Sequence, residues 1–161
     1  MVRLTRAGEY AIRGMVHIAA TADGAVSLRS DIAEAQGIPP SFMAKILRSL
    51  VRARLLRSSR GVHGGFALAR PASRITLLDV VEAIEGPLSL TNCTPDPAGC
   101  PRSAGCPTTA VWLEVQQKMA EVLRNTSVES LLSVQKRNAR TSSAHGRDHA
   151  GKARADLVGH R

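Results

Sequence analysis

The stretch over residues 27–54 constrains the fold of this 161-residue chain more than any other part of it. Apolar residues around Ile32 recur at helical spacing, and the Gly37 that follows is a common helix stop. An Ile-Pro-Pro run then predicts a tight turn, with Pro40 suited to the first turn of the next helix. A short helix over 27–36, a stiff turn and a helix over 40–54 together predict a helix-turn-helix.

The second of these helices has two chemically distinct faces. An apolar stripe predicts contact with a core, and it consists of Phe42, Met43, Ile46, Leu47, Leu50 and Val51. A polar and basic set recurs at helical spacing and so shares one exposed side: Ser41, Lys45, Arg48 and Arg52. The helix is therefore expected to pack on one side and to present cations to solvent on the other.

A hairpin is predicted directly after the helix-turn-helix, because short strands over 55–60 and 66–70 flank a glycine-rich turn. Further helices are expected from Thr5 to about Ala22 and from Thr76 to Ile84, and a long helix near Thr109. The predicted fold class is mainly α with a small β-hairpin wing. It is a winged helix-turn-helix joined to a long helix.

The charge distribution indicates a polyanionic partner. The net charge is +9, and no acidic residue lies between Glu34 and Asp79, where Lys and Arg recur. A solvated basic face is the other reading of the charge alone. Combined with the helix-turn-helix and the wing, the pattern predicts binding to double-stranded DNA.

Seven side chains are predicted to contact DNA: Arg3, Ser41, Lys45, Arg48, Arg52, Arg60 and His63. Ser41 and Lys45 lie near the start of the recognition helix, from which side chains reach base edges. The two arginines further along this helix reach bases or phosphates. The two wing residues are placed for the minor groove, although His63 is equally consistent with an ordinary exposed turn residue.

Composition argues against several other functions. Aromatic residues make up only 2% of the chain, too few for a platform that stacks single-stranded bases. No apolar run has the length of a membrane span and no signal peptide is evident, so a cytoplasmic protein is expected. Neither a nucleophile–base pair nor a phosphate-binding loop is evident, so the chain is not expected to be an enzyme.

The three cysteines of the chain lie close together: Cys93, Cys100 and Cys106. The Pro- and Gly-containing segment between them has no apolar periodicity, and clustered thiols in a reducing compartment predict a metal centre. Their gaps of six and five residues exceed those of structural zinc sites and favour an iron–sulfur cluster, 2Fe-2S or 4Fe-4S. Zinc, a disulfide with one free thiol, and a small iron–sulfur electron carrier are the alternatives.

The predicted helix near Thr109 carries an apolar stripe at heptad-like spacing: Trp112, Val115, Met119 and Val122. Such a stripe suits a partner helix in a homodimer, or packing within one subunit. Thr126 begins a capping box for a last, short helix. From residue 135 onward the chain is basic and poor in apolar residues, which predicts a disordered tail.

Several short motifs occur in one order along about residues 2–133. They are Arg3-Leu-Thr, Tyr10-Ala-Ile-Arg, Asp31-Ile-Ala-Glu, Gly37-Ile-Pro, Arg60-Gly-x-x-Gly-Gly-Phe, Ile75-Thr-Leu-Leu-Asp and the spaced cysteines. In this combination the chain resembles the Rrf2 family of bacterial winged-helix regulators. The resemblance implies a homodimeric transcription factor, with the cysteines as ligands of an iron–sulfur cluster that senses iron supply, nitric oxide or redox state. We expect a repressor.

The resemblance leaves the fourth cluster ligand open. In the branch that controls iron–sulfur assembly, a histidine follows the last cysteine by three residues, and Thr109 stands there in this chain. In the nitric-oxide-sensing and redox-sensing branches, a carboxylate on the first helix of the partner subunit takes this role. Glu9 occupies the matching place, where an ordinary exposed glutamate is the other reading. Asp96, water or a small thiol are competing ligands.

Four regions are therefore expected along the chain. A winged helix-turn-helix domain covers 1–87, and a cluster-binding loop covers 88–107. A dimerisation helix and a short C-terminal helix cover 108–134, and a disordered basic tail covers 135–161.

Overall fold

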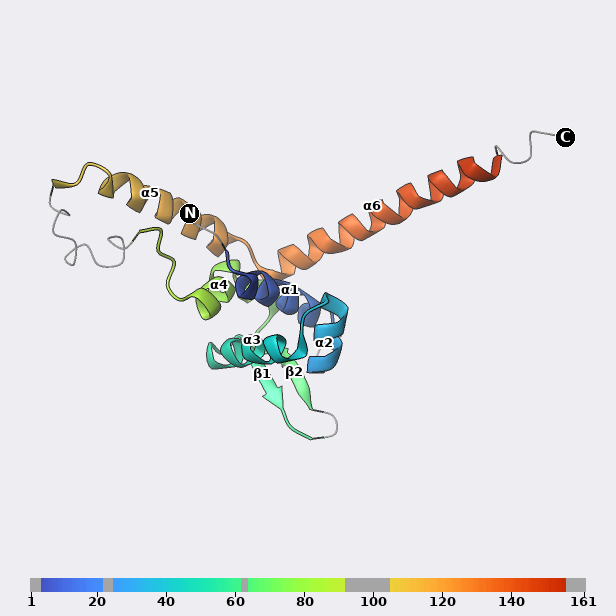
Figure 1. The fold of residues 1–161 in the computed structure, drawn as a ribbon, viewed down its shortest axis with the longest axis horizontal. Coiled ribbons are helices and arrows are strands. Elements are labelled where there is room, and N and C mark those ends of the chain that lie inside the picture. The colour runs from blue at the N-terminus through green and yellow to red at the C-terminus, as the bar shows by residue number, and fades with distance from the viewer. Residues whose placement is uncertain (1–3, 22–24, 62–63, 92–104, 156–161) are drawn as a thin grey trace.

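The computed structural model describes residues 4–21, 25–61, 64–91 and 105–155, with side chains as far as Thr141. A head built from the first four helices and a hairpin lies at the centre, and two longer helices extend from it in different directions (Figure 1). The elements are α1 (Arg6–Ala20), α2 (Arg29–Gln36), α3 (Pro40–Arg52), β1 (Leu56–Ser59), β2 (Gly65–Leu68), the short 3-10 helix η1 (Ala72–Arg74), α4 (Leu77–Glu85), α5 (Thr109–Asn125) and α6 (Val128–Ala155). The predicted fold class is confirmed in its helices and its wing.

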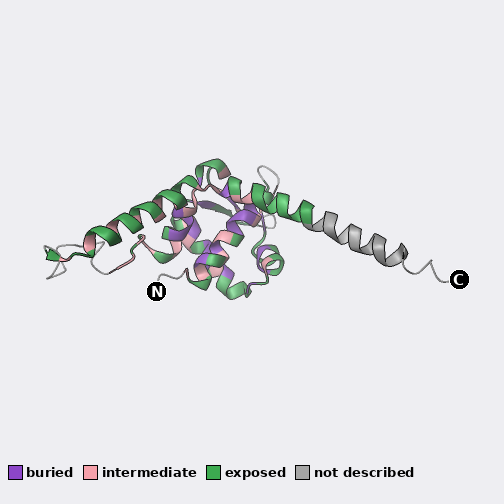
Figure 2. Cartoon of the chain, turned by 90° about the horizontal axis from the view of Figure 1, so that it is seen from above, coloured by how far each residue is buried: buried purple, intermediate pink, exposed green. Residues whose placement is uncertain are grey.

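Helix α1 is the centre of the head, and it packs against α2, α3, α4, α6 and β2. The Thr5 hydroxyl caps its start by accepting a hydrogen bond from the Gly8 amide at 3.3 Å. Its inner face includes Ala11 and Met15, both fully buried. Buried residues are gathered around this helix, whereas α5 and the described part of α6 are mostly exposed (Figure 2).

The turn between α2 and α3 follows the local signals of the sequence. Gly37 adopts the left-handed conformation with φ of 62°, and the Ile38 amide then donates to the Ala33 carbonyl at 2.8 Å. Helix α3 buries Met43, Ile46, Leu47 and Leu50, as its apolar stripe predicts. Phe42 is an exception, because it remains 39% exposed and instead meets the ring of Tyr10 edge-on, with 5.8 Å between ring centroids.

The wing is an antiparallel pair in which Leu56 lies opposite Leu68 and Ser59 lies opposite Gly65. A third segment joins it, because Ser27 and Phe66 exchange backbone hydrogen bonds of 2.9 Å in both directions. The helix expected from residue 27 therefore begins at Arg29, since Ser27 is extended and pairs with the wing.

The head does not end at residue 87, because the start of α6 completes its core. Thr76 and Ser127 form an isolated bridge, and the Val128 amide donates to the Ile75 carbonyl at 2.9 Å. Val128 is 1% exposed and lies in the same apolar cluster as α1 and α3. Leu131 and Leu132 pack against this cluster from the next turn. The DNA-binding head thus includes a segment that local patterns assign to the C-terminal part.

The C-terminal region differs from the expected short helix and disordered tail. Helix α6 spans 28 residues and reaches Ala155, deep into the segment expected to be disordered. Over residues 128–141 the physical reason lies in helix propensity, because this part contains neither Gly nor Pro and includes Leu, Gln, Lys, Arg and Ala. A low apolar content argues against a core, but it does not argue against an exposed helix.

Candidate functional site

The basic side of α3 is fully presented to solvent. Ser41, Lys45, Arg48 and Arg52 are all exposed, while the opposite side of the helix is buried in the head. The Arg52 guanidinium donates a hydrogen bond to the neighbouring Ser49 hydroxyl at 3.4 Å. The structure therefore brings the four recognition-helix residues of the sequence prediction onto one accessible surface.

A hollow of about 410 Å³ joins this surface to the wing. Arg48 of α3 and Arg29 of α2 line it together with Ser59 and Gly61 of the hairpin. Arg60 is exposed beside the hollow, whereas Arg3 and His63 lie outside the described residues. The helical pattern of α3 does not predict Arg29 as a DNA-binding residue. Arg29 lies in the first turn of the preceding helix, however, and in a helix-turn-helix that helix crosses the DNA backbone.

Cys106 lies just before α5 and is partly exposed. Its Sγ atom is 3.2 Å from the Thr108 hydroxyl. Hydrogen bonds from the side chains of Thr108 and Thr109, followed by that from the Thr108 backbone, lower the pKa of the Cys106 thiol to about 7 from its ordinary 9.0. A substantial fraction of this thiol is therefore a thiolate near neutral pH, the form that binds metals and acts as a nucleophile.

Thr109 has a second feature that bears on a cofactor. Its hydroxyl oxygen is shielded from solvent, and the side chains that the structure describes offer it no partner other than the Cys106 thiol, whose pKa it helps to lower. An acidic thiol beside hydroxyl donors fits a thiolate ligand of a soft metal centre, whose sulfur atoms accept such hydrogen bonds.

The remaining predicted ligands are not assembled in the described part of one chain. Cys93, Cys100 and Asp96 lie outside the described residues. Glu9 is exposed in the first turn of α1. Within the described ranges, no group of three or more His, Cys, Asp or Glu residues is placed to hold a metal ion.

Helix α5 presents an apolar surface that the described part of the chain leaves exposed. Trp112, Val115 and Val122 are 40%, 41% and 65% exposed, and α5 buries no residue. Met119 is only partly exposed, because it lines a groove of about 500 Å³ between α1, α4 and α5. Three members of the predicted stripe are thus open to solvent, and the fourth faces the head.

Comparison with known proteins identifies the family to which this winged head belongs. The Rrf2 family, described as an iron-dependent transcriptional regulator, matches residues 4–134. The chain belongs to the Rrf2 family. It is 42% identical over 130 residues to Rv1287 of Mycobacterium tuberculosis, provisionally named an HTH-type transcriptional regulator, and the match covers 79% of each chain.

Two further likenesses agree with this assignment. The chain is 33% identical over 135 residues to the HTH-type transcriptional regulator IscR of Xenorhabdus nematophila, covering 83% of this chain and 81% of IscR. The solved structure of CymR, the global cysteine regulator of Bacillus subtilis, superposes with a TM-score of 0.68 at 25% identity, covering 83% of this chain and 98% of CymR.

Membership of the Rrf2 family makes this chain a DNA-binding transcriptional regulator with a winged helix, and it confirms the expectation that the chain is not an enzyme. The predicted duplex DNA partner is confirmed at the level of the family. Among the residues that the structure describes, no helix of this Rrf2 regulator is long and apolar enough to cross a membrane.

Proposed function

We propose that this Rrf2 regulator is a repressor whose hold on its operator is controlled by an iron–sulfur cluster. Ser41 and Lys45 would read base edges in the major groove, with Arg48 and Arg52 reaching bases or phosphates. Arg60 and His63 would enter the minor groove, and Arg3 would contact the backbone. The exposure of the basic side of α3, continuous with the hollow beneath the wing, supports this assignment.

The acidity of Cys106 is the observation that carries the cluster proposal. Cys93, Cys100 and Cys106 are the only cysteines of the chain. Hydroxyl donors at the start of α5 hold Cys106 as a partly ionised thiol. The family description as iron-dependent supports iron over zinc. When bound, an iron–sulfur cluster would supply a centre sensitive to oxidants, nitric oxide and iron supply, 2Fe-2S and 4Fe-4S forms being both compatible with three thiolates.

The proposal includes a homodimer built on the open side of α5. Trp112, Val115 and Val122 give this helix an exposed apolar stripe at coiled-coil spacing. A dimer would also allow the partner subunit's Glu9 to serve as the fourth ligand, which the exposed position of this side chain permits. We place the regulator in the cytoplasm, where its DNA and reduced thiols are found together.

Anaerobic purification followed by DNA binding tests this function. We expect a coloured protein that contains iron and acid-labile sulfide, and that binds duplexes selected from a random-sequence library. Removing the cluster with a chelator, or replacing all three cysteines by serine, should change the affinity for the selected duplex. Identical affinity in loaded, stripped and triple-serine protein would contradict control by a cluster.

A regulator that uses the thiols directly, or through zinc, is the second candidate. A partly ionised Cys106 is also a competent nucleophile for thiol exchange, and the fold is similar to that of CymR, a cysteine regulator. A colourless protein without iron, whose DNA affinity changes on oxidation or with bound zinc, would favour this candidate. A small electron carrier would instead show reversible reduction without salt-sensitive DNA binding.

A further inference from the structure

The segment that leads from α4 towards the first cysteine is anchored on two sides. The Leu88 amide donates to the Glu82 carboxylate at 3.2 Å, which fixes the segment to α4. The Leu90 amide donates to the Gln116 side-chain oxygen at 3.3 Å, which fixes it to α5. We call residues 86–91 the loop arm. A change in the cysteine loop that shifts this arm therefore acts on the end of α4.

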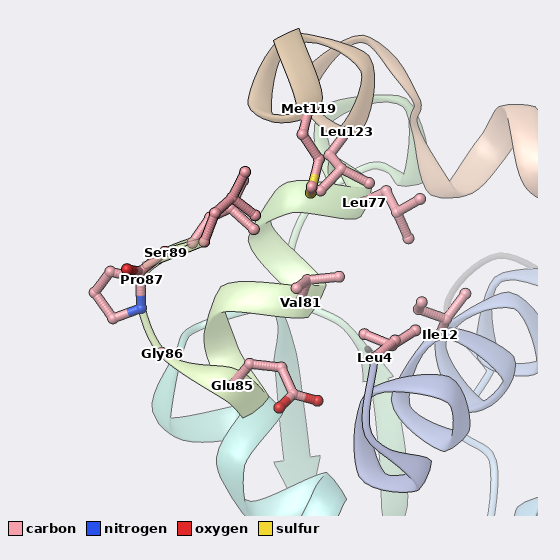
Figure 3. A pocket seen from close by; sticks show the side chains of 12 residues that line it. Leu4, Ile12, Leu77, Val81, Glu85, Gly86, Pro87, Ser89, Met119 and Leu123 are labelled. Carbon is pink, nitrogen blue, oxygen red and sulfur yellow. The ribbon is translucent and has the colours of Figure 1, made fainter. Parts of the chain in front are cut away.

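Glu85 is the last residue of α4, and its carboxylate holds the start of α1. Its Oε1 atom accepts a hydrogen bond from the Thr5 hydroxyl at 2.6 Å and faces the Thr5 amide at 3.3 Å. Figure 3 shows Glu85 reaching from α4 to a position beside Leu4, at one end of the groove between α1, α4 and α5. Thr5 is itself the cap of α1, so the last residue of α4, which directly precedes the loop arm, holds this helix at its cap.

The first turn of α1 lies close to this carboxylate, although the Glu85 side chain itself is exposed. A Cβ atom on Gly8 would lie 2.6 Å from Glu85 Oε1 and 2.6 Å from a methyl carbon of Leu4. An added Cβ at position 8 would therefore require the ends of the Glu85 and Leu4 side chains to move aside. A displacement of Glu85 would act on the helix cap through its 2.6 Å hydrogen bond to the Thr5 hydroxyl.

Helix α1 extends from this point to the recognition helix. One turn and a half beyond Gly8, Gly14 lies against α3, where an added Cβ would be 3.7 Å from the terminal methyl carbon of Met43. Ile32 of α2 contacts the same position at 3.8 Å. A tilt of α1 set at Thr5 would thus reach both helices of the helix-turn-helix through packed, fully buried side chains.

We infer that Glu85 is a positioning residue that couples the cysteine loop to the DNA-binding face, through its hydrogen bond to the cap of α1. The inference rests on the proposed control by a cluster, and it names a route within one subunit. Glu85 touches neither DNA nor the cysteines in this role. It sets the angle of α1, and the position of α3 depends on that angle. The spacing of the two recognition helices of a dimer therefore depends on it as well.

The experiment measures the ratio of operator dissociation constants between cluster-free and cluster-loaded protein. Wild type is compared with Glu85→Ala, Thr5→Val and the double variant, each checked for cluster content and thermal melting. Thr5→Ser keeps the hydroxyl and is the conservative variant. Glu121→Ala is the matched control, since it removes an exposed acid on α5, away from the Glu85–Thr5 contact.

We expect Glu85→Ala and Thr5→Val each to move the ratio about fivefold or more towards one, and the double variant to move it no further than either alone. Thr5→Ser and Glu121→Ala should keep the wild-type ratio. Unchanged ratios in both Glu85→Ala and Thr5→Val would overturn the inference and leave the proposed function intact. A wild-type ratio of one would instead overturn the proposed function, and this coupling with it.

Discussion

Ser27 and Phe66 pair as strand residues, each donating its amide to the carbonyl of the other at 2.9 Å. This pair ties the start of the helix-turn-helix to the wing, so the two DNA-binding parts hold a fixed relation. Gly65 makes the approach possible, because a Cβ there would lie 2.8 Å from the Ser27 carbonyl oxygen, an atom of the backbone that cannot move aside cheaply.

Gly65→Ala is therefore expected to lower the free energy of unfolding by about 1–3 kcal/mol, the usual cost of forcing atoms into a packed site. Its DNA affinity should fall as well, because the wing must shift relative to α2. Urea unfolding and fluorescence anisotropy measure the two effects. Gly105→Ala is the matched control, since an added Cβ there meets nothing within 4 Å. Equal stability of the two variants would show that the wing is not fixed by this contact.

Arg48 is predicted to bind a phosphate or a base from the hollow between α3 and the wing. If each subunit of a dimer makes about four cationic contacts, the log–log slope of affinity against salt is roughly −7. Arg48→Ala removes one contact per subunit and should reduce the magnitude of the slope by about 2. The control is Lys118→Ala, which removes a cation on α5 that pairs with Glu114 at 2.6 Å. Salt titrations of DNA affinity measure the slope for both variants. An equal slope in Arg48→Ala and Lys118→Ala would contradict a DNA contact by Arg48.

The sequence predicts those parts of the fold that depend on local signals. Gly37 ends α2 with a positive φ, and Thr76 caps α4 through a capping box, each from residues a few positions apart. The pairing of Ser27 with Phe66, and the contribution of Val128 to the head, depend on residues distant along the chain. Helical and strand periodicity record which side of an element is apolar, but they do not record which distant element covers it.

The candidate site shows the same division. The exposed basic side of α3 follows directly from helical spacing, and the structure agrees with it. The lowered pKa of Cys106 depends on where the hydroxyls of Thr108 and Thr109 point, which spacing does not define. The link between Glu85 and Thr5 joins the two ends of the head, so it has no local signature at all.

Cys106 is expected to react with iodoacetamide as a thiol of pKa about 7 in cluster-free protein. Its thiolate fraction should therefore rise through neutral pH, where an ordinary thiol is almost fully protonated. Thr108→Val removes the strongest hydrogen bond to the sulfur and should raise the pKa, which slows alkylation severalfold at pH about 7. Thr108→Ser keeps the hydroxyl and should react like wild type.

This measurement is best made in a Cys93→Ser and Cys100→Ser background, so that mass spectrometry follows one thiol. The rate of alkylation is measured against pH for this background with and without Thr108→Val. If the two profiles coincide, the Thr108 hydroxyl does not stabilise the thiolate.

Val115 is expected to lie at the interface of the dimer, because it is 41% exposed in the middle of the open stripe of α5. Val115→Glu places charges opposite one another in that interface and should convert the protein to monomers. Sedimentation velocity measures the conversion, and DNA affinity should fall with it because two half-sites are no longer bound together. Gln117→Glu, an equal change of charge on another exposed position of α5, should remain dimeric. A dimeric Val115→Glu protein would place the interface elsewhere.

The first two turns of α6 are expected to stabilise the head, and the rest of the helix is not. Val128 is 1% exposed, and Leu131 and Leu132 pack against the same core, whereas residues 135–141 are exposed. Ending the chain after Thr141 should therefore leave the free energy of unfolding within about 0.5 kcal/mol of wild type. Ending it after Thr126 removes the three core residues and should cost more than about 3 kcal/mol, enough to unfold much of the protein. Urea unfolding of both truncations tests the division, and a large loss of stability in the longer one would show that the distal helix packs on the protein after all.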